Sequence, residues 1–366
     1  MIVLIPCYKR TSILHLVIQS VLQCSTVGID ERILILIVNN CYLSKDEIDL
    51  VVSASRFEGS FECEIIHRQN QLPPIESWFS AIFSKATENE VVMLNGDDDL
   101  LLPWGLSSRY REINKHNSDM LVSNFCQRMF FFDRGEKYWA DFLMPAAPME
   151  EREAVPWIYE PARHSILTFI SNHTYRNTSS FRKGYQKAID WCEAQSWVSF
   201  ETSSANLPGY LPFAIYQSGG SIFCTDEETV IRGSIAEEAI RQEYADGGNT
   251  SFFTLLIYNN FKNPLLHADL NLYSETRDIH LRAFLSDVVG ILMNNTISKS
   301  ELWETFKRSK IPVHDLIKPE ILLNYLSIIK VLLPIRGFRL RQAVRNDKLK
   351  FTSDFMLALV ENQSYV

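Results

Sequence analysis

The chain has 366 residues, of which 46% are hydrophobic and 12% aromatic, so it can bury the cores of about two or three domains. This composition excludes a disordered or collagen-like polymer. The formal net charge of −8 argues against a dedicated nucleic-acid binder, because such a protein normally presents a strongly basic face to the phosphates.

Strand and helix patterns alternate through the first 125 residues. Apolar runs predict strands, and apolar residues three or four positions apart predict the helices between them. Ser44 and Glu47 have the spacing of a capping box, which marks the start of a helix. In chain order, we predict a strand at 2–5, a helix over 13–22, a strand at 33–38, a helix over 44–54, a strand at 63–67, a helix from 74 and a strand at 91–94.

This order predicts an α/β fold with an open, doubly wound, mostly parallel sheet and helices on both faces, because parallel crossovers are right-handed. Residues 119–232 combine short strand patterns with several prolines, whereas residues 237–349 have mainly helical patterns. We therefore expect a boundary near residue 235, between an α/β domain over 1–235 and a mainly α-helical domain over 236–366.

The seven cysteines are isolated, with no Cys-x-x-Cys pair, so neither a zinc ribbon nor a redox dithiol is indicated. The first residues lack the basic and long apolar regions of a signal peptide. No apolar run approaches the roughly 20 residues of a spanning helix. We expect a cytoplasmic location, where thiols stay reduced.

Three consecutive aspartates, Asp97, Asp98 and Asp99, come after the predicted strand at 91–94. Ligands of open α/β sheets bind at the carboxyl ends of strands. Carboxylates at such a position repel one another unless a cation or hydrogen-bond donors compensate. Their oxygens suit Mg²⁺ or Mn²⁺, which can bridge a diphosphate and stabilise it as a leaving group. We expect a metal site among these three aspartates, the alternative being an exposed acidic turn.

Four segments together resemble the family 2 glycosyltransferases of the GT-A fold, particularly the bacterial enzymes that build surface polysaccharides. They are residues 2–10, residues 37–40, Asn70 ahead of the helix with Trp78, and residues 95–103. The resemblance covers residues 1–125 well and extends loosely to about residue 235. It implies a metal-dependent glycosyltransferase with a GT-A sheet, which moves a sugar from a nucleotide-diphosphate donor to a saccharide acceptor.

In this family the first strand and its loop lie against the nucleotide, and this chain can stack Tyr8 on a base and pair Arg10 with phosphate. The family usually has an acidic residue where this chain has Asn39, although an amide still donates and accepts. Arg232 ends a segment that resembles the last core strand of this family. Two roles stay open for it: contact with the diphosphate, or an ion pair with the acids at 226–228. The resemblance assigns to the nucleotide sugar Pro6, Tyr8, Arg10, Asn39, Arg68, Asn70, Asp97 and Arg232. For Arg68 a surface salt bridge is the alternative.

The acidic motif departs from the family pattern at its first position, which is Gly96 here. An Asp-x-Asp pair remains as Asp97 and Asp99. Alignment on Pro103 makes Asp98 an equally good ligand, so all three aspartates stay candidates.

Inverting transfer needs a general base beside the acceptor hydroxyl, normally Asp or Glu. The family places it near a helix that the segment 209–213 resembles, but this segment contains no acid. The nearby candidates are Asp190, Glu193 and Glu201, of which Glu201 is closest. The alternative for each of them is a solvated helix residue without a catalytic role. A retaining mechanism, which does not need such a base, also stays open.

Residues 330–350 carry seven basic residues against one acid, interleaved with apolar residues. Such a segment can lie on an anionic bilayer, as suits a lipid-linked acceptor of O-antigen or capsule synthesis and a peripheral position on the inner face of the cell membrane. Its alternative is an amphipathic helix packed on the catalytic domain.

Two other functions stay open: a nucleotidyltransferase, although residues 7–11 lack the glycines of its usual loop, and a non-catalytic scaffold of a glycan assembly complex.

Overall fold

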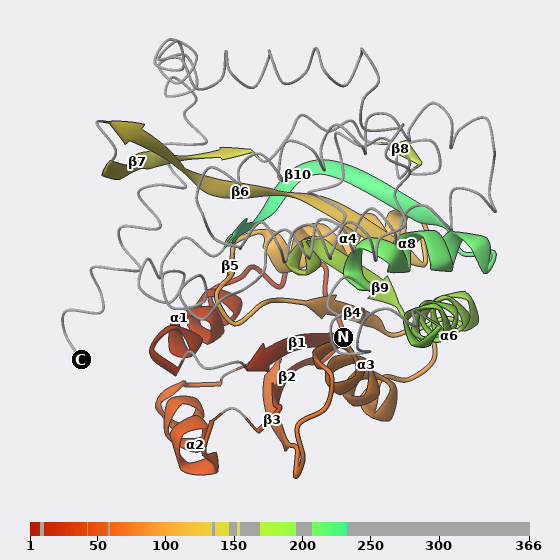
Figure 1. Cartoon of the computed structure of the whole chain (residues 1–366), viewed down its shortest axis with the longest axis horizontal. Coiled ribbons are helices and arrows are strands. Elements are labelled where there is room, and N and C mark those ends of the chain that lie inside the picture. The colour runs from red at the N-terminus through yellow and green to blue at the C-terminus, as the bar shows by residue number, and fades with distance from the viewer. Residues whose placement is uncertain are drawn as a thin grey trace, which may run out of the picture.

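The computed structural model describes residues 1–7, 11–41, 43–57, 59–133, 136–145, 152–153, 169–194 and 207–232 (Figure 1). Its strands are β1 (Ile2–Cys7), β2 (Ile33–Asn39), β3 (Phe61–His67), β4 (Val91–Leu94), β5 (Leu100–Leu101), β6 (Met120–Asp133), β7 (Glu136–Pro145), β8 (Arg152–Glu153), β9 (His173–Arg176) and β10 (Ile222–Arg232). Its helices are α1 (Thr11–Leu22), α2 (Lys45–Ala54), α3 (Pro74–Lys85), α4 (Gly105–Lys115), the 3-10 helix η3 (Ile170–Asn172), α6 (Ser179–Glu193) and α8 (Leu207–Gln217).

The strands form one sheet in the order β3-β2-β1-β4-β9-β6-β10-β5, with β7 beside β6 and β8 beside β10. The pairs β3–β2, β2–β1, β1–β4 and β6–β10 are parallel, whereas β9 is antiparallel to β4 and β6 and β5 is antiparallel to β10. Of these eight strands only β9 and β5 are reversed, so six share one direction. The prediction of an α/β fold with a mostly parallel sheet is confirmed.

The core is built on β1 and β2, whose apolar runs are buried on both faces. Residues 2–5 and 35–38 are all at most 1% exposed. Strands of this kind need helices on both sides of the sheet. Figure 1 shows α1 and α2 on one side of β1–β3 and α3 on the other, as the alternation predicted.

The apolar face of α3 packs into the core. Phe79 is fully buried, and its ring centroid lies 5.9 Å from that of Tyr175 on β9 and 4.8 Å from that of Tyr185 on α6. Aromatic pairs at such separations add to the stabilisation from buried area. This cluster holds α3 and α6 to the same face of the sheet.

The capping box of α2 is present, since Ser44 Oγ accepts a hydrogen bond from Glu47 N and the Glu47 carboxylate accepts one from Ser44 N. No helix in the described ranges is long and apolar enough to cross a bilayer. The predicted boundary near residue 235, the helical domain over 236–366 and the basic segment 330–350 all lie outside the described residues.

Candidate active site

The carboxyl ends of β1, β2 and β4 meet at one edge of the sheet. Cys7 pairs with Asn39 across β1 and β2, and Leu4 pairs with Leu94 across β1 and β4. Burial raises the pKa of the Cys7 thiol well above its usual range, and the negative charge of Asp97 raises it further. The first aspartate after β4 therefore lies near the end of β1, at the edge where sheets of this kind bind ligands.

Residues 95–99, which we call the acidic turn, fold back on themselves directly after β4. Asn95 is fully buried, and its amide nitrogen donates to the carbonyl of Asp99 at 2.9 Å. Asp97 and Asp99 are only 7% and 4% exposed, and Asp98 is half-buried. The burial of two carboxylates distinguishes this turn from the exposed surface turn that was the alternative.

Gly96 makes room for the carboxylates beside it. A Cβ atom built on Gly96 would lie 2.6 Å from Asp99 Oδ2, 3.1 Å from Ser171 Oγ and 3.2 Å from Asp98 Oδ1. Both carboxylates therefore converge on the space above the Gly96 Cα, which a side chain would fill. This explains in physical terms why the first position of the acidic motif is glycine in this chain.

Two converging carboxylates fit a divalent cation of the Mg²⁺ or Mn²⁺ kind. Mg²⁺ is commonly bound through one or two carboxylates and completes its shell with water and substrate phosphates. Within the described ranges, no group of three or more His, Cys, Asp or Glu side chains could hold a metal by itself. A cation bound here would need further ligands from outside this set, and the assignment of the aspartates as ligands stays a prediction.

Ser171 in η3 belongs to this site, although the sequence gives no signal for it. It is fully buried, accepts a hydrogen bond from Gly96 N at 2.7 Å and donates one to Asp99 Oδ2. It stands 72 positions beyond Asp99 in the chain. Only the insertion of β9 between β4 and β6 brings η3 to the acidic turn.

A buried cation, Arg109 on α4, lies beneath the same region. Its Nε donates to Thr229 Oγ1 on β10 at 2.7 Å, and its two terminal nitrogens have no hydrogen-bond partner among the described residues. Burial lowers the pKa of Arg109 to about 9, while the charges of Cys24 and Asp99 act in the opposite direction. The guanidinium therefore stays protonated at neutral pH, where it offsets part of the charge of Asp99.

Arg232 ends β10 near the strand that follows the acidic turn. Its neighbours Val230 and Ile231 pair with Leu101 and Leu100 in the antiparallel pairing of β10 and β5. Its exposed guanidinium lies 5.5 Å from the ring centroid of Phe169.

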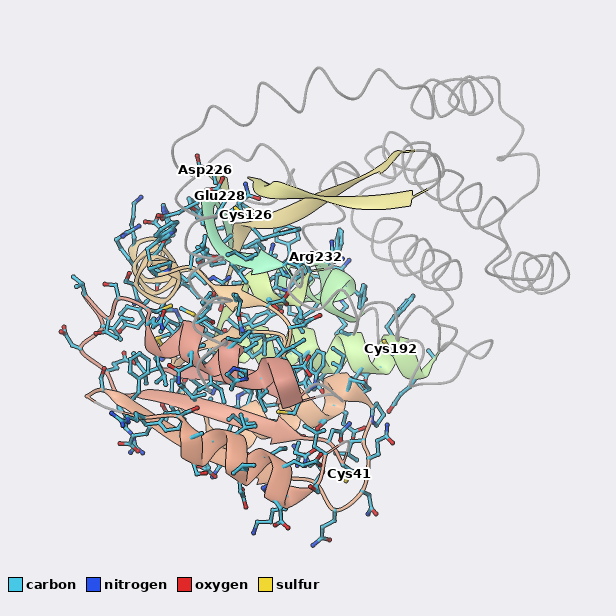
Figure 2. The ribbon with its side chains drawn as sticks, turned by 90° about the vertical axis from the view of Figure 1, so that its left-hand side faces the viewer. Cys41, Cys126, Cys192, Asp226, Glu228 and Arg232 are labelled. Atoms are coloured by element: carbon cyan, nitrogen blue, oxygen red, sulfur yellow. The ribbon has the colours of Figure 1, made fainter. Side chains whose placement is uncertain are left out.

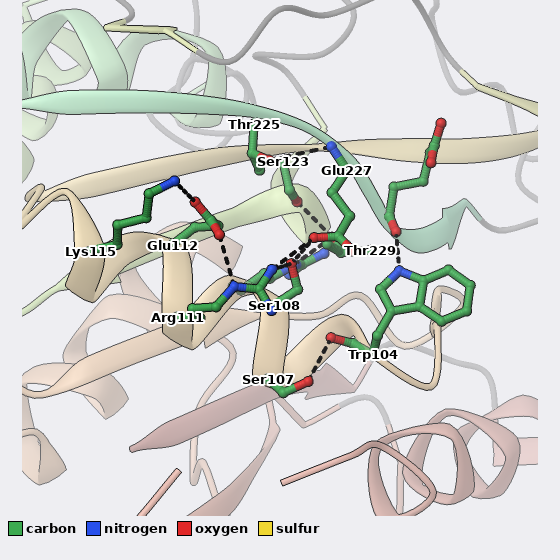
Figure 3. Close-up of polar contacts among 12 residues, drawn as sticks. Trp104, Ser107, Ser108, Arg111, Glu112, Lys115, Ser123, Thr225, Glu227 and Thr229 are labelled. Atoms are coloured by element: carbon green, nitrogen blue, oxygen red, sulfur yellow. Dashed lines mark hydrogen bonds and ion pairs between the residues drawn. The ribbon is translucent and has the colours of Figure 1, made fainter. Parts of the chain in front are cut away.

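The acids at 226–228, the alternative partners of Arg232, lie elsewhere on β10. Figure 2 shows Asp226 and Glu228 well apart from Arg232 on this strand. Glu227 instead pairs with Arg111 at 3.2 Å and accepts a hydrogen bond from Ser108, both on α4 (Figure 3).

Two predicted nucleotide ligands are engaged in the protein itself. The side chain of Asn39 donates to the carbonyl of Leu43 at 2.8 Å and accepts from its backbone nitrogen at 3.3 Å, so it shapes the loop after β2. Arg68 donates to the Ser77 carbonyl and the Ser80 hydroxyl of α3 at 2.7 and 2.8 Å. It joins the end of β3 to α3, and among the described residues it forms no salt bridge of the kind named as its alternative.

The other residues predicted to bind the nucleotide sugar lie in and after β1 and β3. Pro6 is buried in β1 opposite Val38, and Asn70 is exposed in the loop after β3. Tyr8 and Arg10 lie outside the described residues. The structure therefore brings Pro6, Asn39, Arg232 and the acidic turn to one edge of the sheet.

The candidate bases on α6 have the character of solvated helix residues. Asp190 is exposed and accepts a hydrogen bond from Gln186 one turn earlier at 2.7 Å. Glu193 is exposed at the end of the helix. Glu201 lies outside the described residues. The segment 209–213 is helical, as expected, and forms part of α8.

No model of a known protein family matches the sequence, and no curated protein is similar to it. Among solved structures, the chain is similar to S. aureus TarS 1–349 in complex with UDP, with 13% identity and a TM-score of 0.43 over 78% of this chain and 80% of that one. For the complex of TarS 1–349 with UDP-GlcNAc, the identity is 14% and the TM-score 0.43, over 78% of this chain and 80% of that one. For the longer TarS structure, the identity is 13% and the TM-score 0.43, over 82% of this chain and 49% of that one.

Scores of this size are too low to transfer an activity. The class of the protein rests instead on its own geometry: an α/β protein with a mostly parallel sheet and a buried acidic turn at the edge where such sheets bind ligands.

Proposed function

We propose that this protein is a metal-dependent glycosyltransferase that moves a sugar from a nucleotide-diphosphate donor to a saccharide acceptor. The observation that carries the proposal is the convergence of the Asp98 and Asp99 carboxylates over Gly96, at the carboxyl edge of a GT-A-like sheet. A pair of hard oxygen donors at this edge suits a divalent cation that also binds a diphosphate.

The residues of the acidic turn have distinct roles in this proposal. Asp98 and Asp99 hold the cation, which when bound stabilises the negative charge of the departing diphosphate. Asp97, beside the end of β1, faces the nucleotide. Arg232, the residue after Ile231 at the end of β10, pairs with a phosphate oxygen, because guanidinium groups bind phosphate through charge-assisted hydrogen bonds.

The nucleoside lies against the ends of β1 and β2 in this proposal, near Pro6 and the loop that Asn39 shapes. Tyr8, Arg10 and Asn70 complete this side. The acceptor is a saccharide, in our proposal a lipid-linked one of surface polysaccharide synthesis. The basic segment 330–350 would then hold the protein on the anionic inner face of the cell membrane. Glu201, Asp190 and Glu193 remain the candidate bases for an inverting reaction.

The proposal is tested by binding and by donor turnover. A ligand that binds only the native state raises stability by RT ln(1 + [L]/Kd), so UDP, GDP, CDP and dTDP are screened by thermal shift with Mn²⁺ and with EDTA. We expect one diphosphate to stabilise the protein only with Mn²⁺. The matching nucleotide sugar should then be hydrolysed or transferred in the same metal-dependent way.

Variants of the acidic turn make the test specific. We expect Asp98→Asn and Asp99→Asn each to lose at least tenfold in Mn²⁺-dependent donor turnover. The exposed Asp46→Asn on α2 is a matched control that should keep it. Full turnover in the Asp99→Asn variant or in EDTA would contradict the proposal. Failure of all four diphosphates to bind would favour the non-catalytic scaffold.

A further inference from the structure

We propose that Ser171 is a positioning residue that orients the Asp99 carboxylate toward the bound cation. This inference rests on the proposed function, because it assigns a role at the same cation site. In this inference the Ser171 hydroxyl acts through its hydrogen bond to Asp99 and is not itself a ligand of the cation.

The hydrogen bonds around Ser171 fix the direction of its proton. The Gly96 backbone nitrogen can only donate, so Ser171 Oγ accepts at that contact, which is 2.7 Å long. The single hydroxyl proton of Ser171 is therefore directed to Asp99 Oδ2. A hydroxyl held from two sides in this way fixes the rotation of the Asp99 carboxylate.

Ser171 is itself held by a rigid support. The neighbouring Asn172 donates from Nδ2 to the Ser123 carbonyl at 2.9 Å, and Ser123 Oγ donates to the Asn172 carbonyl at 3.1 Å. Ser123 Oγ lies 2.6 Å from Thr229 Oγ1, which accepts from Arg109 Nε at 2.7 Å. Figure 3 shows Ser123 and Thr229 in contact between β6 and β10. The acidic turn is thus connected through η3 to two core strands.

A fixed orientation of the Asp99 carboxylate matters for cation binding, because the site is buried and the negative charges of Asp98 and Asp99 repel each other. Asp98 and Asp99 converge on the same space, and the hydrogen bond from Ser171 to Asp99 opposes a movement of that carboxylate. Hydrogen bonds that hold a metal ligand in place typically change metal affinity by about 10- to 100-fold. We therefore expect a loss in this range when the Ser171 hydroxyl is removed.

The test is a Mn²⁺ titration of the full chain, monitored by the electron paramagnetic resonance signal of free and bound Mn²⁺. We expect Ser171→Ala to weaken Mn²⁺ binding about tenfold or more and to change the spectrum of the bound ion. Ser171→Cys, which keeps the size of the side chain with a weaker donor, should give an intermediate Kd. This second variant serves if Ser171→Ala does not fold.

Ser20 provides the matched control. It is also fully buried, accepts a backbone hydrogen bond from Leu101 at 3.2 Å and donates one to the Val17 carbonyl at 2.7 Å. Its Ala variant should lose a comparable free energy of unfolding in urea but keep the Mn²⁺ affinity and spectrum.

The outcomes separate this inference from the proposed function. If the unaltered protein binds Mn²⁺ and Ser171→Ala binds it equally well, with the same spectrum, Ser171 is only structural and the inference is overturned alone. If the unaltered protein binds no Mn²⁺, the proposed cation site is overturned and the inference with it.

Discussion

Gly96 has no side chain, and carboxylate oxygens of Asp98 and Asp99 lie close to the place where its Cβ would be. We predict that Gly96→Ala weakens Mn²⁺ binding about tenfold or more, because the new methyl group displaces Asp99 from the Ser171 hydroxyl. Overpacking of a buried site also lowers the free energy of unfolding by about 1–3 kcal/mol. Mn²⁺ titration and urea denaturation measure the two effects separately.

Gly59 gives the control for this substitution. It has a φ of +68° and nothing within 4 Å of a built Cβ, so Gly59→Ala is strained by about 1–2 kcal/mol through its backbone alone. Its Mn²⁺ affinity should not change. Gly96→Ala with unaltered Mn²⁺ affinity would show that the convergence of carboxylates is not the cation site.

At the scale of residues, the sequence predicted the site residues that come directly after a strand and missed those that distant elements contribute. Three aspartates after an apolar run stand out in the chain, and two of them are buried at the expected edge. Ser171 and Arg109 are an ordinary serine and an ordinary arginine in sequence, and their partners are 72 and 120 positions away. Only the order of the strands brings them into the site.

At the scale of elements, the predicted alternation from β1 to β4 is confirmed because each element buries a regular apolar pattern. The polar strand β9, with His173 and Thr174, has no such pattern. It forms because β4 and β6 offer backbone partners on both sides of it. Hydrogen bonding to neighbours therefore decides this element, which local sequence could not predict.

The contact between α6 and α8 depends on a glycine. A Cβ built on Gly184 would lie 2.7 Å from both the Cα and the backbone nitrogen of Ile215. Gly→Ala in an exposed helix normally stabilises by up to about 1 kcal/mol. We predict the opposite sign for Gly184→Ala, a loss of about 1–3 kcal/mol in the free energy of unfolding, because backbone cannot move aside as a side chain can.

Urea denaturation measures this loss, and Lys187→Ala on the exposed side of α6 is the control. It should stay within about 0.5 kcal/mol of the unaltered protein, as surface substitutions usually do. A Gly184→Ala variant as stable as the unaltered protein would mean that the two helices are not in this close contact in solution.

At the scale of the whole molecule, the net charge of −8 does not reveal that two buried groups, Cys24 and Arg109, change the stability in opposite directions as the pH rises. Burial raises the pKa of the Cys24 thiol from 9.0 to about 12, whereas burial lowers that of Arg109 to about 9. Between these values the unfolded chain has lost the thiol proton that the folded chain keeps. It keeps a guanidinium proton that the folded chain loses. Cys24 therefore lowers stability as pH rises, and Arg109 raises it.

Because these contributions oppose one another, the contribution of Cys24 is visible only by comparison with a variant. Each proton difference changes the free energy of unfolding by about 1.4 kcal/mol per pH unit. In the unaltered protein, Cys24 makes the free energy of unfolding fall by up to this amount per pH unit between pH 9 and 12. We predict that Cys24→Ala lacks this fall, so its free energy of unfolding increases steadily relative to that of the unaltered protein. Urea midpoints measured at pH 7.5, 9 and 10.5 test this, with the exposed Cys41→Ala as the control that keeps the original slope. Parallel pH profiles for Cys24→Ala and the unaltered protein would mean that the thiol, which donates to the Leu102 carbonyl at 3.2 Å, is not held neutral in the folded core.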